Sequence, residues 1–170
     1  MKSFRRVATY AHSIEDVWVA LTDPYAIAEW LMPTTFFEPT VGSKFRFQYE
    51  PEYLCPSGIA DCEVIESEAP RRLAWSWQNR AVEGARQPPP MRVEWTLTPV
   101  AGGTRVELVQ SYEDQPWALT FAMGMGWRFY LRRFLPRALA NVRDGVFERG
   151  AIPLSKRAYK ATNLPDDVII

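Results

Sequence analysis

The sequence predicts an α+β fold in which a curved antiparallel sheet of about six strands packs against one long C-terminal helix. Apolar and polar residues alternate along several segments between residues 4 and 112, which is the pattern of strands with one buried face. From Pro116 to about Glu148 the apolar residues instead recur at helical spacing. Since this is the only segment long enough to cover the apolar face of the sheet, we expect the sheet to grip this helix.

Two short capped helices are expected after the first strand. Ser13 can cap the first helix, with Asp16 three residues on, where a carboxylate meets free backbone N–H groups. Asp23 is a good N-cap for the second helix, and Pro24 suits its first position. Pro33 ends this second helix. We expect the pair to close one end of the sheet.

The expected strands are separated by turn signals such as Pro56-Ser57-Gly58 and Gly102-Gly103. They cover residues 4–10, 44–49, 59–66, 73–78, 92–98 and 104–112. Charged side chains on the last two strands face outward by strict alternation, so cross-strand ion pairs of small energy are expected there. These side chains are Arg92, Glu94, Arg105 and Glu107.

The long helix contains residues that are costly inside a helix. We expect the helix to start late, to break near its glycines or to kink before its proline, because of Gly124, Gly126 and Pro136. The tail that follows has little periodicity, and we expect it to be extended on the surface or partly mobile. We therefore assign residues 1–150 to one domain and residues 151–170 to a C-terminal extension.

Composition describes an ordinary globular chain. Its 170 residues are 47% hydrophobic and 24% charged, and a chain of this length can bury about 70% of its unfolded surface. The formal net charge is zero, so nothing global favours nucleic acid or an anionic membrane. With no run of 18 apolar residues and no signal-peptide pattern, we expect no membrane span and a cytoplasmic location. Cys55 and Cys62 match no metal or redox spacing, and we expect them to be reduced.

A set of large side chains is expected to face the interior together. They are Phe45, Phe47, Tyr49, Trp75, Trp77, Trp95 and Trp127, with Leu131 on the same helical stripe. Both plain core packing and the wall of a hydrophobic pocket fit this pattern, because flat rings that cannot collapse into one another make good walls. Gln110 and Tyr112 are polar residues on or near the same face. A buried amide without a partner costs about 1–3 kcal/mol, so Gln110 should meet a polar side chain, an ordered water or a ligand atom.

Residues for catalysis or metal binding are sparse. His12 is the only histidine, and nothing places a nucleophile beside it. The cysteine and histidine ligands are too few and too badly spaced for a metal site. We therefore expect no catalytic residue, no metal and no cofactor, and an enzyme is the weaker interpretation. On the long helix, Arg128, Arg132, Arg133 and Arg137 form either a solvated face or a docking patch for an acidic protein or an anionic ligand group.

Six segments resemble, in order, the motifs of a known family. They are Val17–Pro24 with Trp30, Val41–Phe45, Gly58–Ala60, Pro70–Trp77, Gly102–Val106, and Gly126-Trp127 with Leu131. Residues 4–145 thereby resemble the heat-shock-protein-90 ATPase activator-like proteins of the START/polyketide cyclase (SRPBCC) superfamily, which have the helix-grip fold of birch-pollen-allergen-like proteins. Two positions depart from the family pattern, which often has His where Gln110 stands and Trp where Leu31 stands. The tail from Ala151 has no counterpart in that pattern.

The resemblance implies a fold, and one fold hosts many functions. The first hypothesis is a carrier or sensor that binds a small hydrophobic or lipid-like molecule in an interior cavity. The second, implied by the family name, is a co-chaperone-type interaction domain with a chaperone partner. The third is a cyclase or aldolase-dehydratase-like enzyme that uses the same cavity. Exposed edge strands permit a homodimer without requiring one.

Overall fold

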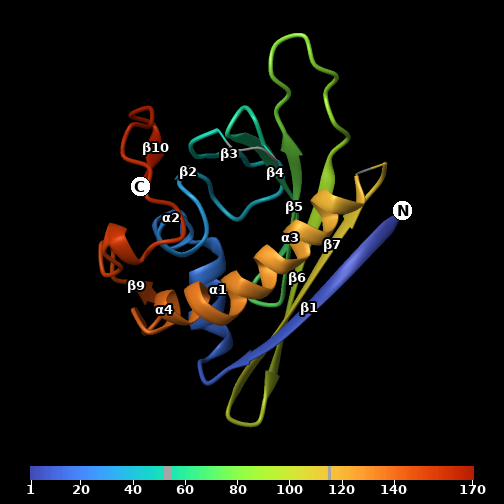
Figure 1. The fold of residues 1–170 in the computed structure, drawn as a ribbon. Coiled ribbons are helices and arrows are strands. Elements are labelled where there is room, and N and C mark those ends of the chain that lie inside the picture. Colours follow the sequence, from blue (N-terminus) through green and yellow to red (C-terminus); the bar gives the residue numbers. More distant parts are fainter. Residues whose placement is uncertain (52–54, 115) are drawn as a thin grey trace.

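The computed structural model describes residues 1–51, 55–114 and 116–170 and has the predicted helix-grip architecture (Figure 1). The strands of the main sheet are β1 (Lys2–Tyr10), β2 (Thr34–Thr35), β3 (Lys44–Gln48), β4 (Ile59–Glu68), β5 (Arg72–Asn79), β6 (Met91–Val100), β7 (Gly103–Tyr112) and β10 (Val168–Ile169). The helices are α1 (Ile14–Thr22), α2 (Pro24–Trp30), α3 (Trp117–Phe129), the π-helix η1 (Tyr130–Phe134), α4 (Leu135–Leu139) and the 3₁₀-helix η2 (Leu154–Lys156). A separate hairpin joins β8 (Val142–Arg143) to β9 (Val146–Phe147).

Within the described residues the main sheet has eight antiparallel strands in the order β1-β7-β6-β5-β4-β3-β2-β10. All six predicted strands are present, each within two residues of its expected bounds. The two further strands, β2 and β10, were not predicted, because strands of two residues are too short to show alternation. β10 comes from the tail and pairs Ile169 with Thr34 at the sheet edge.

The two short helices begin as predicted. The Ser13 hydroxyl accepts the backbone N–H of Asp16 at 3.1 Å. The Asp23 carboxylate accepts the N–H groups of Tyr25 and Ala26 at 2.8 and 3.1 Å, and Pro24 follows it at the first helical position. Each cap thus satisfies N–H groups that the first turn leaves without a helical partner.

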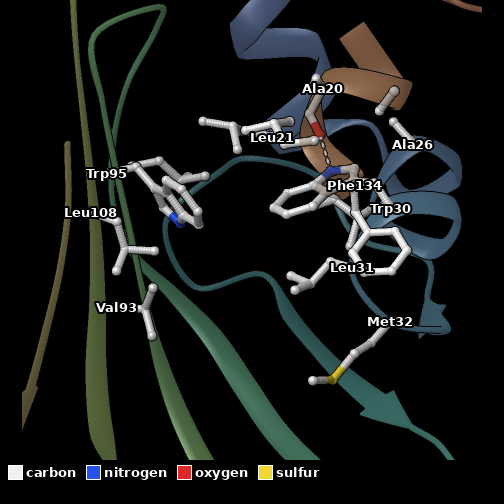
Figure 2. Close-up of a cluster of buried hydrophobic side chains, with 14 of the residues drawn as sticks. Ala20, Leu21, Ala26, Trp30, Leu31, Met32, Val93, Trp95, Leu108 and Phe134 are labelled. Carbon is white, nitrogen blue, oxygen red and sulfur yellow. Dashed lines mark hydrogen bonds between the residues drawn. The ribbon is translucent and has the colours of Figure 1, made fainter. Parts of the chain in front are cut away.

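At the tight junction of α1 and α2, the buried backbone carbonyl of Ala20 lacks its usual donor. In an α-helix the carbonyl of Ala20 accepts from residue 24, but Pro24 has no N–H. The indole N–H of Trp30 donates to this carbonyl instead, at 2.8 Å (Figure 2). Trp30 has no exposed surface, so the bond satisfies two buried polar groups at once.

Of the three irregularities left open for the long C-terminal helix, neither a late start nor a break at the glycines occurs, and the helix ends earlier than expected. α3 passes through Gly124 and Gly126 without a break. At Gly124 the helix approaches Arg6, whose Nε donates to the Gly124 carbonyl at 3.0 Å, and a Cβ there would lie 2.9 Å from the Arg6 guanidinium and displace that side chain. The helix therefore lies close against β1 at this point. α4 ends at Leu139 rather than near residue 148, because the chain turns into the β8–β9 hairpin.

The irregularity expected before Pro136 takes the form of the π-helix η1. The N–H of Leu135 bonds to the carbonyl of Tyr130, and Pro136 has no N–H to offer Leu131. The hydroxyl of Tyr10 donates to the free Leu131 carbonyl at 2.6 Å. Burial raises the pKa of the Tyr10 phenol well above its ordinary value, so the phenol keeps the proton that it donates.

Indole and phenyl rings fill most of the space between the sheet and the helices. Trp95 is fully buried, and its ring lies 6.3 Å from Trp30, 5.9 Å from Trp75 and 5.4 Å from Trp127. Leu21, Leu31, Val93 and Leu108 belong to the same cluster (Figure 2). The indole N–H groups of Trp75 and Trp95 have no hydrogen-bond partner among the described residues.

We predict that Trp30→Phe destabilises the fold more than Trp95→Phe does. Both replacements remove the same indole atoms from sites that are at most 1% exposed, but only Trp30→Phe leaves the Ala20 carbonyl unsatisfied. The difference in the free energy of unfolding should be about 1–3 kcal/mol, measured by urea denaturation. Equal destabilisation by the two variants would contradict the role given to the Trp30–Ala20 bond.

Candidate ligand pocket

A pocket of about 150 Å³ lies between α3, the end of β5 and the C-terminal tail. Its lining is mostly apolar, with a few amide and hydroxyl groups. The lining residues are Leu31, Met32, Tyr49, Cys55, Trp77, Asn79, Leu119, Ala122, Met123, Gly126, Trp127, Tyr130 and Tyr159. The Trp77 indole N–H donates to the Asn79 side-chain oxygen at 2.9 Å, which fixes both groups in the wall.

The structure separates the residues that the sequence grouped as an aromatic wall. Three of them, Tyr49, Trp77 and Trp127, line the pocket. The others are buried in the core next to it: Phe45, Phe47, Trp75, Trp95, Gln110 and Leu131. Tyr112 is half-buried on the same strand as Gln110, where its ring lies 6.5 Å from that of Phe4. The part that any of these residues takes in binding a ligand stays a prediction.

Gln110 connects the sheet to the wall of the pocket. It has no exposed surface, and its side-chain oxygen accepts the indole N–H of Trp127 at 2.6 Å. Of the three kinds of partner expected for Gln110, its oxygen thus meets a polar group of another side chain. Its amide nitrogen points at two thioethers, 3.2 Å from the sulfur of Met91 and 3.7 Å from that of Met123. Because thioethers are weak acceptors, this nitrogen keeps hydrogen-bonding capacity close to the pocket.

The tail supplies one wall of the pocket through Tyr159. Its ring lies 4.9 Å from the ring of Tyr49, and its hydroxyl is 3.3 Å from that of Tyr130. The sequence reasoning missed this residue because an isolated tyrosine in a segment without periodicity carries no signal of burial. The tail is thus packed against the domain, while the domain boundary placed at residue 150 stays a prediction.

The buried carboxylate of Glu29 holds the tail in place. Glu29 is 4% exposed on α2 and accepts the backbone N–H groups of Gly150 and Ile152. Arg157, whose side chain is 10% exposed, lies 3.5 Å from the same carboxylate and donates to the Ile152 carbonyl at 2.7 Å. Glu29 was not identified from the sequence, because nothing in the pattern of a short helix distinguishes a buried glutamate from a solvated one.

A second contact fixes the end of the tail. Arg46 on β3 donates to the carboxylate of Asp167 at 2.7 Å, next to β10. This hydrogen bond and the charge of Arg46 hold the pKa of Asp167 below its ordinary value. The two contacts, one at each end of the tail, keep Tyr159 between them against the pocket.

A second hollow of about 260 Å³ adjoins the pocket under the loop of residues 80–90. The two hollows share Asn79 and Leu119 in their walls. Arg80, which lines the second hollow, is paired with Asp61 through two hydrogen bonds of 2.9 and 2.6 Å. Asp61 thus compensates the charge of Arg80. Arg80 therefore does not supply an unpaired positive charge to the second hollow.

Other candidate residues lie away from the pocket. His12 is half-buried at the start of α1, and its backbone carbonyl accepts from Thr104 at 2.9 Å. Cys55 and Cys62 are buried and unbonded to each other, as expected, and burial raises the pKa of the Cys62 thiol well above its ordinary value. In the described part of the chain, no group of three or more histidine, cysteine or acidic side chains could hold a metal ion.

The charged side chains on β6 and β7 form the expected cross-strand pairs only in part. Glu107 pairs with Arg5 of β1 and Arg92 with Glu66 of β4, whereas the Arg92–Glu94 and Arg105–Glu107 pairs lie within one strand. The N–O distances of these pairs are 2.6 to 3.0 Å. The arginines of the C-terminal helix differ in exposure. Arg128, Arg132 and Arg133 are exposed, whereas Arg137 is half-buried and donates to the Lys156 carbonyl of the tail. Among the described residues, no helix is long and apolar enough to cross a membrane.

The match of a family model identifies the family of this chain. The model described as "Activator of Hsp90 ATPase homolog 1-like protein" matches residues 11–140. The chain belongs to this family. Its helix-grip fold is of the SRPBCC/polyketide cyclase type, an architecture that supports ligand binding in general. No curated protein matches the sequence.

Solved structures similar to this chain agree with the family. Protein MLL2253 from Mesorhizobium loti is 27% identical with a TM-score of 0.68, over 79% of this chain and 95% of that one. CalU16 from Micromonospora echinospora is 29% identical with a TM-score of 0.56, over 79% and 73% of the two chains. The Aha1 dimer from Colwellia psychrerythraea is 17% identical with a TM-score of 0.63, over 78% and 92%, which shows the shared fold.

We predict that Glu29→Ala destabilises the protein by about 3–5 kcal/mol, because it leaves the nearly buried guanidinium of Arg157 without a counter-charge. Glu29→Gln should cost less, since its amide oxygen still accepts one backbone N–H. Urea denaturation measures the stability, and hydrogen exchange of residues 150–170 measures the release of the tail. Wild-type protection of these amides in Glu29→Ala would contradict the anchoring role.

We also predict that Gln110 and Trp127 are energetically coupled. Gln110→Leu leaves the buried indole N–H of Trp127 without an acceptor and should cost about 1–3 kcal/mol. Trp127→Phe should then cost about 1 kcal/mol less in the Gln110→Leu background than in the wild type. A double-mutant cycle of unfolding free energies tests this coupling, and strictly additive effects would contradict it.

Proposed function

We propose that this protein binds a small, flat, apolar molecule in the pocket between α3, β5 and the tail. The observation that carries the proposal is the composition of the wall. The rings of Tyr49, Trp77, Trp127, Tyr130 and Tyr159 surround a space that the core side chains do not fill. Pockets for small molecules are characteristically apolar and aromatic with a few polar groups that orient the ligand.

The size of the pocket limits the ligand. A dry apolar cavity of about 150 Å³ accommodates a molecule the size of benzene, whereas pockets for drug-sized ligands span roughly 300–1,000 Å³. The volume here is about 150 Å³, which supports a single ring or a comparable apolar group at this site. A longer ligand would extend past Asn79 and Leu119 into the neighbouring hollow.

The polar groups of the pocket support recognition rather than a reaction. Asn79 is held by the Trp77 indole, and the amide nitrogen of Gln110 lies behind Met123. Of the two, Asn79 lines the pocket and can orient a ligand that carries a polar atom, whereas Gln110 acts only by fixing the Trp127 indole. The co-chaperone and enzyme hypotheses remain alternatives, because no contact among the described residues favours either of them over ligand binding.

The first experiment is native mass spectrometry of the purified protein, with a co-purified small molecule as the expected result. Direct titration follows with indole and naphthalene as flat probes and decanoate as an aliphatic one. Because Trp77 and Trp127 line the pocket, bound probes should change the intrinsic tryptophan fluorescence. No co-purified molecule, together with no fluorescence or thermal-stability response to any probe, would contradict the proposal.

We predict that Gly126→Leu abolishes probe binding without destabilising the protein. Gly126 lines the pocket, and a Cβ there would meet only the Tyr130 ring at an ordinary 3.7 Å. Replacing a helical glycine should also recover up to about 1 kcal/mol of helix propensity. The matched control is Ala118→Leu on the exposed side of the same helix, which should bind the probes like the wild type. Full binding by Gly126→Leu would place the probes elsewhere.

A further inference from the structure

The outward face of α3 carries a row of large apolar side chains at every fourth position. These residues, here called the α3 stripe, are Trp117, Phe121, Met125 and Phe129, which are 81%, 66%, 48% and 53% exposed. Contiguous apolar surface of this kind marks an interaction site more often than single exposed residues do. In Figure 1, α3 lies in front of the sheet, and no other element covers it in that view.

The α3 stripe is separate from the ligand pocket. The pocket is lined by Leu119, Met123 and Gly126, which lie on the other side of the helix at 3.6 residues per turn. The buried residues Thr120, Gly124 and Trp127 form a third side, toward the sheet. The stripe therefore needs an explanation of its own.

Opposite charges stand at the two ends of the stripe. Glu113 and Asp114 precede α3, whereas Arg132 and Arg133 follow it in η1, and all four side chains are exposed. No ion pair involves these residues in the described part of the chain. Between Pro116 and Leu131 the only charged residue is Arg128. Arg128 is exposed three residues after Met125, so it adds to the basic end of this face. The face is thus apolar from Trp117 to Met125, acidic before this segment and basic after it.

This pattern is self-complementary when reversed about its centre, which falls at Met123. A second copy of α3 in antiparallel orientation would place Trp117 opposite Phe129, and Phe121 opposite Met125. It would also place the acidic pair Glu113–Asp114 opposite the basic pair Arg132–Arg133. A parallel arrangement would instead bring like charges together at both ends.

We propose that the α3 stripe is the interface of a homodimer in which two copies of α3 pack antiparallel across a two-fold axis. Such an interface is isologous, because each surface residue meets its counterpart from the partner with the roles exchanged. The apolar rings form the centre, and the charged ends fix the antiparallel register. Arg133, 5.8 Å from the Phe129 ring, brings its charge to the edge of the apolar centre.

An anionic membrane surface is a weaker fit to the same face. It would attract the arginines and accept the aromatic rings. However, Glu113 and Asp114 immediately precede the stripe, and a helix lying flat on the membrane would press these carboxylates against the lipid phosphates. A second copy of the chain satisfies both ends of the stripe.

Sedimentation equilibrium of the full chain over a range of concentrations tests the dimer. The wild type should self-associate reversibly. Two charge-reversed variants, Glu113→Arg/Asp114→Arg and Arg132→Glu/Arg133→Glu, should each dimerise about tenfold or more weakly, because like charges then face each other. An equimolar mixture of the two variants should form a heterodimer, since each end again meets its opposite charge.

A substitution in the apolar centre has a matched control. Phe121→Ser should weaken the dimer, whereas Phe36→Ser, at a residue 60% exposed outside the stripe, should leave it unchanged. Circular dichroism of each variant verifies the fold. The proposal is overturned if the folded wild type stays monomeric at every concentration. A monomer that co-sediments with phosphatidylglycerol vesicles would overturn it in favour of a membrane surface. It is equally overturned if the charge-reversed variants dimerise like the wild type or their mixture stays monomeric.

Discussion

Two prolines determine where the helices of this protein stand against its sheet. Pro24 and Pro136 each deprive a carbonyl in the preceding helical turn of a donor, at Ala20 and at Leu131. In both places a buried aromatic side chain supplies the missing hydrogen, Trp30 to Ala20 and Tyr10 to Leu131. The first bond locks the short helices together, and the second fixes the C-terminal helix to the end of β1. A carbonyl left open in the interior would cost more than the bond itself contributes, so these two contacts favour the observed placement of the helices.

The position of the pocket follows from this arrangement. Near Leu131 the C-terminal helix is held close to the sheet, and the indoles of Trp75 and Trp95 fill the space beneath. Within α3 itself, Arg6 holds the carbonyl of Gly124, and the bond from Trp127 to Gln110 holds the next turn, both in the C-terminal half of the helix. The tail, rather than the helix, closes the remaining side, and the open volume lies there. The proposed ligand site is therefore at the edge of the sheet–helix interface and not in the middle of it.

The sequence predicted the regular part of the fold well, because strands with one buried face and capped helices leave periodic signals. It failed where the decisive feature is a single residue. Nothing distinguishes the buried Glu29 from a solvated glutamate, and Tyr159 lies in a segment without periodicity. The predicted end of the long helix near residue 148 was wrong, although the sequence contained the signal that corrects it. Asp144-Gly145 is a typical hairpin turn, and both residues have positive φ angles, 51° and 72°. For the proposed site, the alternation in the sequence identified which side chains face inward. It did not identify which of these rings border open space, because that depends on the path of the tail.

The match to the family ends at residue 140, but the folded unit does not. Phe147 and Ile152 are part of the hydrophobic core, and Val168 is buried at the sheet edge. A recombinant chain trimmed to the family boundary would expose the apolar surface that these side chains cover and would lose the Tyr159 wall as well. Relatives that share the sheet but carry other C-terminal segments can thus present differently shaped recesses on the same scaffold. Ligand preference inferred from one member therefore does not transfer to this chain by alignment of the common region alone.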